Sequence, residues 1–472
     1  MTSQERGVSG KQRARKLPAD PVGPIGLAGY GAKLRDGSIT AEAATLAYLE
    51  RIALLDGRLQ AFVHVAAEQA LEQARAMDRL LASGTDLGPL MGVPVAVKDL
   101  FSIQGMPASR CGSRVDIADL VEPEGEFVRR LKRAGCVLLG KTRMTEFAFG
   151  LVNMTHPTPW NPCDATTHRL PGGSSSGSAV AMAAGLCAFS IGSDTGGSVR
   201  QPAALCGVFG HKATAGFWPT DGVFALSTTL DSIGYFARSA RDGALILSAL
   251  SDRPVPAPRP TRGLRLGRPA GHYFDNLAPE VASATQRALE RLENSGVEIV
   301  PIDVPEAAEV NSVFLPLVAV ELIATVGVER FKRARDLLDP IVWNRAERML
   351  EYPARDYVLC RRRQQALCGI ASERMRGLDG WITPTTPDVP LPRAGLETLE
   401  QAAAWTARGT HTTRPGNMFG QCGVSIPIPG TALPVGLQVM CRAGADEALL
   451  SISQGIEEVL GPPPERDMSA FL

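Results

Sequence analysis

Apolar residues along the chain follow two alternating patterns, one typical of helices and one typical of buried strands. Across residues 40–83 they recur at three- and four-residue spacing, which predicts two helices, with Thr40 capping the first and a break near residues 56–57. Residues 92–97 form a β-branched run that predicts a buried strand, and Lys98 stands at its end. A helix at 126–134 and a strand at 136–140 follow. This alternation predicts an α/β fold.

The second half of the chain continues the alternation around one mainly helical stretch. Residues 305–376 lack strand patterns, and we interpret them as a helical insertion beside the core, where substrate selection is often built. The proline-rich stretch 254–260 fits either a linker or a connection inside one domain, and we favour a single domain over residues 21–472. Strands are further predicted at 263–267, 297–300, 381–383, 424–427 and 434–439, and helices at 279–295 and 446–460.

Two segments bear on membrane association. No window of about twenty uncharged apolar residues is present, so we predict no transmembrane helix. The alanine-rich stretch 179–191 comes nearest, and its place after a Gly/Ser loop favours a buried helix. Residues 1–20 are polar and mildly basic without a signal-peptide core, which predicts a flexible arm and a cytoplasmic protein.

Composition narrows the classes of partner. The 472 residues are 44% hydrophobic, enough for a large core. The 49 basic and 49 acidic side chains cancel, which argues against partners chosen by bulk charge, such as nucleic acid or an anionic membrane. Nine widely spaced cysteines without a Cys-x-x-Cys pair argue against both a disulfide framework and a zinc site.

The candidate chemistry lies in two glycine-flanked serine turns, at residues 172–178 and 194–198. A serine hydroxyl needs a base to become a nucleophile, and none of the six histidines stands in a pattern that marks one. A buried lysine can serve instead, because desolvation lowers its pKa, and Lys98 follows a strongly apolar strand. Consecutive N–H groups from Thr195 to Ser198 can converge on a developing oxyanion.

Other interpretations of the first serine turn stay open at this point. It can simply cap the helix that follows it. A phosphate cradle is less favoured because the Lys-Ser/Thr ending of a P-loop is missing. Residues 173–177 also satisfy Gly-x-Ser-x-Gly, with Ser175 as the nucleophile, but residues 168–171 before them make a poor strand.

Three segments taken together resemble the amidase signature family, namely residues 92–99, 172–178 and 192–200. The order and spacing of their serines agree with that family, and the resemblance spans about residues 40–460. It implies a single α/β domain with a mixed, twisted sheet covered on both faces by helices. It further implies hydrolysis of an amide through an acyl-enzyme, with no metal or organic cofactor.

The resemblance also implies a role for each residue of a Ser-cisSer-Lys triad. Ser198 would be the nucleophile, Ser174 a bridging serine in a cis peptide after Gly173, and Lys98 the base. The oxyanion would be held by the N–H groups of Thr195, Gly196, Gly197 and Ser198.

Supporting and substrate-binding residues are predicted around this triad. We expect Ser175 to hydrogen-bond within its loop, and Arg200 to pair with Asp194 and hold the second turn. An apolar substrate pocket is expected to include Met154, Phe217 and Trp218, although a place in the core explains these residues equally well. Such a pocket favours hydrophobic or aryl amides, with esters and carbamates as further small-molecule substrates.

Two alternative functions remain. Residues 200–203 read Arg-Gln-Pro-Ala, as in the glutaminase subunit of the tRNA-dependent amidotransferase. Against that function, the Arg-Val-Ser-Arg-Tyr-Gly segment of the glutaminase is replaced at residues 216–222, and its tyrosine-rich segment at residues 351–357. A non-catalytic binding protein on the same fold is the other alternative, and the occupied triad positions argue against it. The sequence leaves a homodimer open.

Overall fold

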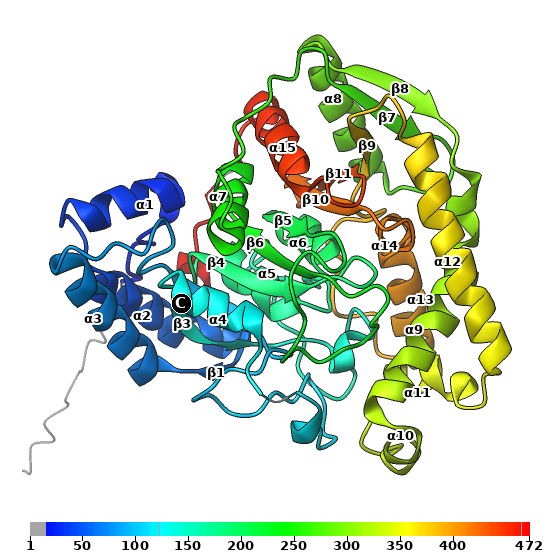
Figure 1. Cartoon of the computed structure of the whole chain (residues 1–472), viewed down its shortest axis with the longest axis horizontal. Helices are drawn as coiled ribbons and strands as arrows, with labels where there is room; N and C mark the ends of the chain where they lie inside the picture. Colours follow the sequence, from blue (N-terminus) through cyan, green and yellow to red (C-terminus); the bar gives the residue numbers. More distant parts are fainter. Residues whose placement is uncertain (1–15, 122, 464) are drawn as a thin grey trace, which may run out of the picture.

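The computed structural model describes residues 16–121, 123–463 and 465–472. Most of the predicted N-terminal arm, residues 1–15, therefore lies outside the described residues. The remainder forms one α/β unit built on a single sheet of eleven strands (Figure 1).

The strands come from the whole length of the chain. They are β1 (Phe62–Val65), β2 (Pro94–Lys98), β3 (Val137–Thr142), β4 (Phe189–Ser193), β5 (Phe209–Lys212), β6 (Ile233–Ala237), β7 (Arg265–Pro269), β8 (Glu298–Ile302), β9 (Gly380–Pro384), β10 (Cys422–Pro427) and β11 (Gly436–Cys441). Their order is β1-β3-β2-β4-β6-β5-β10-β11-β9-β7-β8. Parallel pairs join β3, β2 and β4 and also β9, β7 and β8, while the other neighbours are antiparallel. Strands from both sides of the proline-rich stretch 254–260 share this sheet, so that stretch connects elements of one domain.

Helices cover both faces of the sheet. They are α1 (Gly26–Arg35), α2 (Ala41–Leu59), α3 (Ala67–Ala82), α4 (Glu126–Arg133), α5 (Ser176–Ala183), α6 (Arg200–Cys206), α7 (Ala240–Ser251), α8 (Pro279–Asn294), α9 (Val310–Val326), α10 (Val328–Arg333), α11 (Pro340–Ala346), α12 (Ala354–Arg374), α13 (Leu399–Gly409), α14 (Arg414–Met418) and α15 (Asp446–Leu460). Helices α7 and α15 pack together against central strands, and α5 and α6 form a second such pair. Helices α9 to α14 gather on one side of the molecule, at the right of Figure 1.

Most predicted elements are confirmed, and two boundaries differ. Thr40 caps α2 by accepting a hydrogen bond from the N–H of Ala43, but the helix runs through residues 56–57 and ends only before Gln60, whose φ is +54°. Strand β1 then separates α2 from α3. The predicted helix at 179–191 is wrong in its second half, because α5 ends at Ala183 and β4 follows. Gly185, with φ +62°, allows the chain to turn between them.

The helical stretch 305–376 is present as predicted and contains an unexpectedly long apolar segment. By length and composition alone, Pro305–Val326 is suited to crossing a membrane, although it contains charged residues such as Glu321 and so differs from the uncharged stretch considered in the sequence. More than half of that window is buried within the protein, and α9 packs against α11, α12 and α14. These contacts are those of a helix that belongs to a protein core.

Candidate active site

The site begins where two parallel strands end. Val97 of β2 pairs with Ile191 of β4, so Lys98 and Ser193, the last residues of these strands, meet at one edge of the sheet. The Nζ atom of Lys98 donates a hydrogen bond to Ser193 Oγ over 2.9 Å. Carboxyl ends of parallel strands commonly form ligand sites in α/β proteins.

Ser174 completes the surroundings of the Lys98 amine. The Gly173–Ser174 peptide is cis, as the resemblance implied, and Lys98 Nζ donates to Ser174 Oγ over 2.7 Å. The preceding turn depends on glycine, since a Cβ atom on Gly173 would lie 2.7 Å from the carbonyl oxygen of Leu151. The amine of Lys98 thus contacts Ser174 of the first serine turn and Ser193, the residue just before the second.

The protonation state of Lys98 is set mainly by its burial. Its side chain is fully buried, which disfavours the ammonium form and lowers its pKa to about 7, although the carboxylates of Asp231 and Asp194 act in the opposite direction. A large fraction of neutral amine is therefore present near neutral pH. Asp231 is itself partly buried, and this burial raises its pKa to about 6. Its carboxylate accepts a 2.5 Å hydrogen bond from the Thr195 hydroxyl.

The second serine turn contributes three of its four candidate residues to the wall of a cavity. Thr195, Gly196 and Ser198 line a narrow cavity of about 30 Å³, and their N–H groups donate to no other group within the described part of the chain. The N–H of Gly197 differs, because it donates to Asp194 Oδ1 over 2.8 Å. Gly197 therefore holds the shape of the turn, and the predicted set of four oxyanion donors narrows to three.

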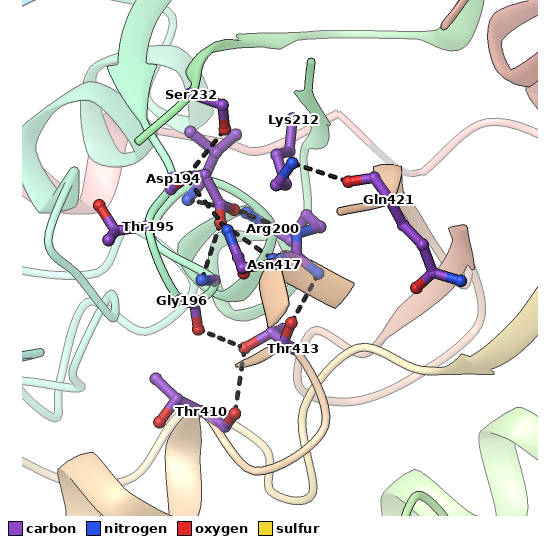
Figure 2. Close-up of polar contacts among 12 residues, drawn as sticks. Asp194, Thr195, Gly196, Arg200, Lys212, Ser232, Thr410, Thr413, Asn417 and Gln421 are labelled. Atoms are coloured by element: carbon purple, nitrogen blue, oxygen red, sulfur yellow. Dashed lines mark hydrogen bonds and ion pairs between the residues drawn. The ribbon is translucent and has the colours of Figure 1, made fainter. Parts of the chain in front are cut away.

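An internal ion pair holds that turn in place. Figure 2 shows Arg200 beside Asp194, as the sequence predicted, with Nη2 of Arg200 2.9 Å from Oδ1 and Nε 3.1 Å from Oδ2. Asn417 of α14 adds a hydrogen bond from its Nδ2 to Asp194 Oδ1. Burial alone would raise the pKa of Asp194, yet the Arg200 guanidinium holds it well below its usual range.

The other predicted site residues lie elsewhere. Ser175 hydrogen-bonds to the backbone carbonyl of Ser193 over 3.2 Å rather than within its own loop. Trp218 packs against Phe127 and donates its Nε1–H to Ser251 Oγ, while Phe217 lies edge-on against it. Met154 and these two aromatic residues do not line the cavity beside Ser198. Core packing, the other explanation of their apolar character, accounts for Trp218.

Several residues of the site were not predicted from the sequence. Ser193 ends strand β4, whose first residues fall in the stretch 179–191 that the sequence predicts as a helix, so no pattern placed Ser193 beside Lys98. Arg345 and Arg414 line the cavity from α11 and α14, and single arginines in helical segments carry no local signal. Phe314 of α9 also lines it, so the helical stretch 305–376 contributes to the wall. Among the residues that the structure describes, no cluster of three or more His, Cys, Asp or Glu side chains is arranged to hold a metal.

Known proteins resemble this chain over nearly its whole length. A family profile described as amidase matches residues 43–450. The chain is 36% identical to a 2-amino-5-chloromuconic acid deaminase of Comamonas testosteroni over 93% of this chain and 96% of that protein. It is 34% identical to a glutamyl-tRNA(Gln) amidotransferase subunit of Synechococcus sp. strain RCC307, over 95% and 100% of the two chains. A solved amidase structure superimposes with a TM-score of 0.84 and 31% identity, covering 92% of this chain and all of the other.

Proposed function

We propose that Ser198 is the nucleophile of this enzyme and that Ser174 and Lys98 relay the proton. The premise is that the chain belongs to the amidase family and hydrolyses carbon–nitrogen bonds other than peptide bonds. The single observation that carries this proposal is the contact between Lys98 Nζ and Ser174 Oγ at 2.7 Å, made by an amine whose pKa burial lowers to about 7. A lysine of ordinary pKa would be protonated and unable to accept a proton at neutral pH.

The proposed first step acylates the enzyme. Neutral Lys98 takes the proton of the Ser174 hydroxyl while Ser174 takes that of Ser198, and Ser198 Oγ bonds to the carbonyl carbon. The free N–H groups of Thr195, Gly196 and Ser198 stabilise the oxyanion. As the carbon–nitrogen bond breaks, the relay runs backward and the departing nitrogen receives the proton.

The second step releases the acid. Water attacks the ester carbon of the acyl-enzyme, its proton passes through the same relay, and the Ser198 hydroxyl is restored. The net reaction consumes one water and yields a carboxylic acid and an amine or ammonia. Ammonia as the departing group is supported by the likeness to a protein named as a deaminase.

A substrate panel tests this proposal. Aliphatic primary amides, aryl anilides, esters and carbamates are incubated with the enzyme and with the Ser198→Ala variant, and product release is measured. We expect hydrolysis of at least one amide by the enzyme and none by the variant. Labelling of Ser198 by an acylating serine reagent, located by mass spectrometry, checks the nucleophile directly, and unlabelled Ser198 with full turnover would overturn the assignment.

The likeness to one component of an amidotransferase supports a second candidate function, release of ammonia from glutamine for a partner protein. Glutamine belongs in the same panel for that reason. Activity on glutamine that appears only after a partner protein is added would favour this candidate over a free-standing amidase.

A further inference from the structure

Two guanidinium groups line the same cavity as the candidate nucleophile. Arg345 comes from α11 and Arg414 from α14, and both share the cavity wall with Ser198, Thr195 and Gly196. Two cationic side chains in the wall of one small cavity are unusual, because buried charges in proteins are usually paired.

Neither arginine has an acidic partner. Across the described ranges of the chain, no carboxylate lies within 4.0 Å of either guanidinium, whereas Arg200 nearby is paired with Asp194. Arg414 donates only to neutral oxygens, on Asn311 and Thr410, and stacks 4.6 Å from the ring of Phe314. Arg345 stacks 4.3 Å from the ring of Phe149.

Both arginine side chains also have a hydrogen-bond donor that is not used within the described protein. The Nε atoms of Arg345 and Arg414 are buried and donate to no group in the described part of the protein. An unsatisfied buried donor costs free energy, so a ligand that accepts these hydrogen bonds would gain from them. Burial lowers the pKa of Arg345 to about 10 and that of Arg414 to about 9, and the charge of Arg345 contributes to the lower value. Both groups remain protonated at neutral pH.

Side-chain hydrogen bonds anchor the segments that carry the two arginines. Thr413, next to Arg414, donates its hydroxyl to the carbonyl oxygen of Gly196 over 3.0 Å, as Figure 2 shows. Helix α11, which carries Arg345, is capped by Asp339, whose carboxylate also accepts the N–H of Met154. The segment of Arg414 is therefore tied directly to the serine turn, and the start of the helix that carries Arg345 is tied to the segment around Met154.

We propose that Arg345 and Arg414 bind a carboxylate of the substrate, so that the enzyme acts on small amides that carry an acidic group a few carbon atoms from the scissile carbonyl. Guanidinium groups present paired donors that match the geometry of a carboxylate. The narrow cavity favours a short chain, such as the monoamide of a four-carbon dicarboxylic acid. This inference rests on the proposed function of Ser198, and it replaces the expectation of hydrophobic or aryl amides.

The test compares succinamate with butyramide, which has a methyl group in place of the carboxylate. We expect the enzyme to prefer succinamate in kcat/KM by about 100-fold or more. Arg345→Gln and Arg414→Gln should each lower that preference by about tenfold or more, with Arg414→Lys intermediate because it keeps the charge. Arg335→Gln is the matched control, since Arg335 also stacks on an aromatic ring, that of Trp343, but is exposed and outside the cavity. An unchanged preference in both Gln variants would overturn the inference.

A binding measurement separates this inference from the chemistry. Calorimetric titration of the Ser198→Ala variant with succinamate and with butyramide needs no turnover. Tighter binding of succinamate that is lost on adding Arg414→Gln supports the anion site even if another residue proves to be the nucleophile. Equal binding of the two amides, in an enzyme whose hydrolysis depends on Ser198, would overturn the anion site and leave the proposed function standing.

Discussion

Buried positive charge is held in opposite ways on the two sides of Ser198. Behind the serine turn, Arg200 is fully buried and paired with Asp194, and Asn417 completes their hydrogen bonds. Across the cavity, the partners of Arg345 and Arg414 among the described residues are neutral oxygens and aromatic rings. The paired arginine holds the backbone in shape, whereas the unpaired arginines keep their charge available to a ligand.

Lys98 is another buried basic residue, and it differs from the arginines because it can lose its charge. It too is fully buried, but its hydrogen bonds go to serine hydroxyls, and desolvation lowers its pKa to about 7. A lysine can lose its proton when buried, while an arginine remains charged at neutral pH. The choice of residue type therefore matches each proposed role, since the proposed base must lose its charge and the proposed anion ligands must retain theirs.

The largest effect is expected from Lys98→Ala, which removes the proton acceptor from the relay. We expect kcat to fall by about 10⁴-fold or more, as when a member of a catalytic triad is lost. Steady-state kinetics on a hydrolysed amide measures the change, and circular dichroism verifies the fold.

A second buried lysine provides the control for that variant. Burial lowers the pKa of Lys212 to about 8, but its amine donates to the backbone carbonyls of Ala213 and Gln421. Lys212→Met should cost stability and retain turnover per folded molecule. Equal losses of kcat in both variants would contradict the relay, because they would show that replacing any buried lysine lowers kcat to the same extent.

The variant Asp194→Asn removes the buried ion pair between Asp194 and Arg200. Removing one partner of a buried ion pair leaves Arg200 uncompensated, and we expect a loss of about 3–5 kcal/mol in the free energy of unfolding. Urea unfolding measures it, with Glu447→Gln as the control because Glu447 pairs with Arg253 at the surface, where such pairs contribute about 0–1 kcal/mol. A loss below about 1 kcal/mol would show that the pair does not stabilise the turn.

The pH dependence tests the role of Lys98 in another way. Its protonated form is inactive as a base, so kcat/KM should fall about tenfold per pH unit below about 7 and level off above it. The Asp231 carboxylate favours the ammonium form, so Asp231→Asn should lower the pKa of Lys98 and move the midpoint to lower pH. This effect belongs to the pH range above about 6, where Asp231 is ionised. A midpoint that stays in place or moves upward would contradict it.

The smallest effect is expected from Ser175→Ala. Among the described residues its hydroxyl hydrogen-bonds to the backbone of Ser193 alone, so the variant should keep measurable turnover of the same amide. Ser174→Ala, one residue away, is the matched comparison and should lose nearly all of it. Similar losses of turnover in the two variants would show that Ser174 has no role in the relay that Ser175 lacks.

Local patterns predicted much of the fold because they depend on near neighbours in the chain. The apolar run before Lys98 is strand β2, and Thr40 caps α2. The stretch 179–191 shows the limit of such patterns, because a short apolar run suits a helix or a buried strand equally. Its division into α5 and β4 places Ser193 beside Lys98, and parallel pairing with β2 decides that division.

The α/β class, the two serine turns, the lysine behind its strand and the family membership all follow from the order of residues in the chain. Which donors and charges remain free follows instead from the way the chain folds. The Gly197 N–H is engaged by Asp194, and Arg200 is neutralised, while Arg345 and Arg414 are not. The physical reason is that pairing and burial depend on atoms brought together from distant parts of the chain, such as Asn417 and Asp194, and no local pattern records those contacts.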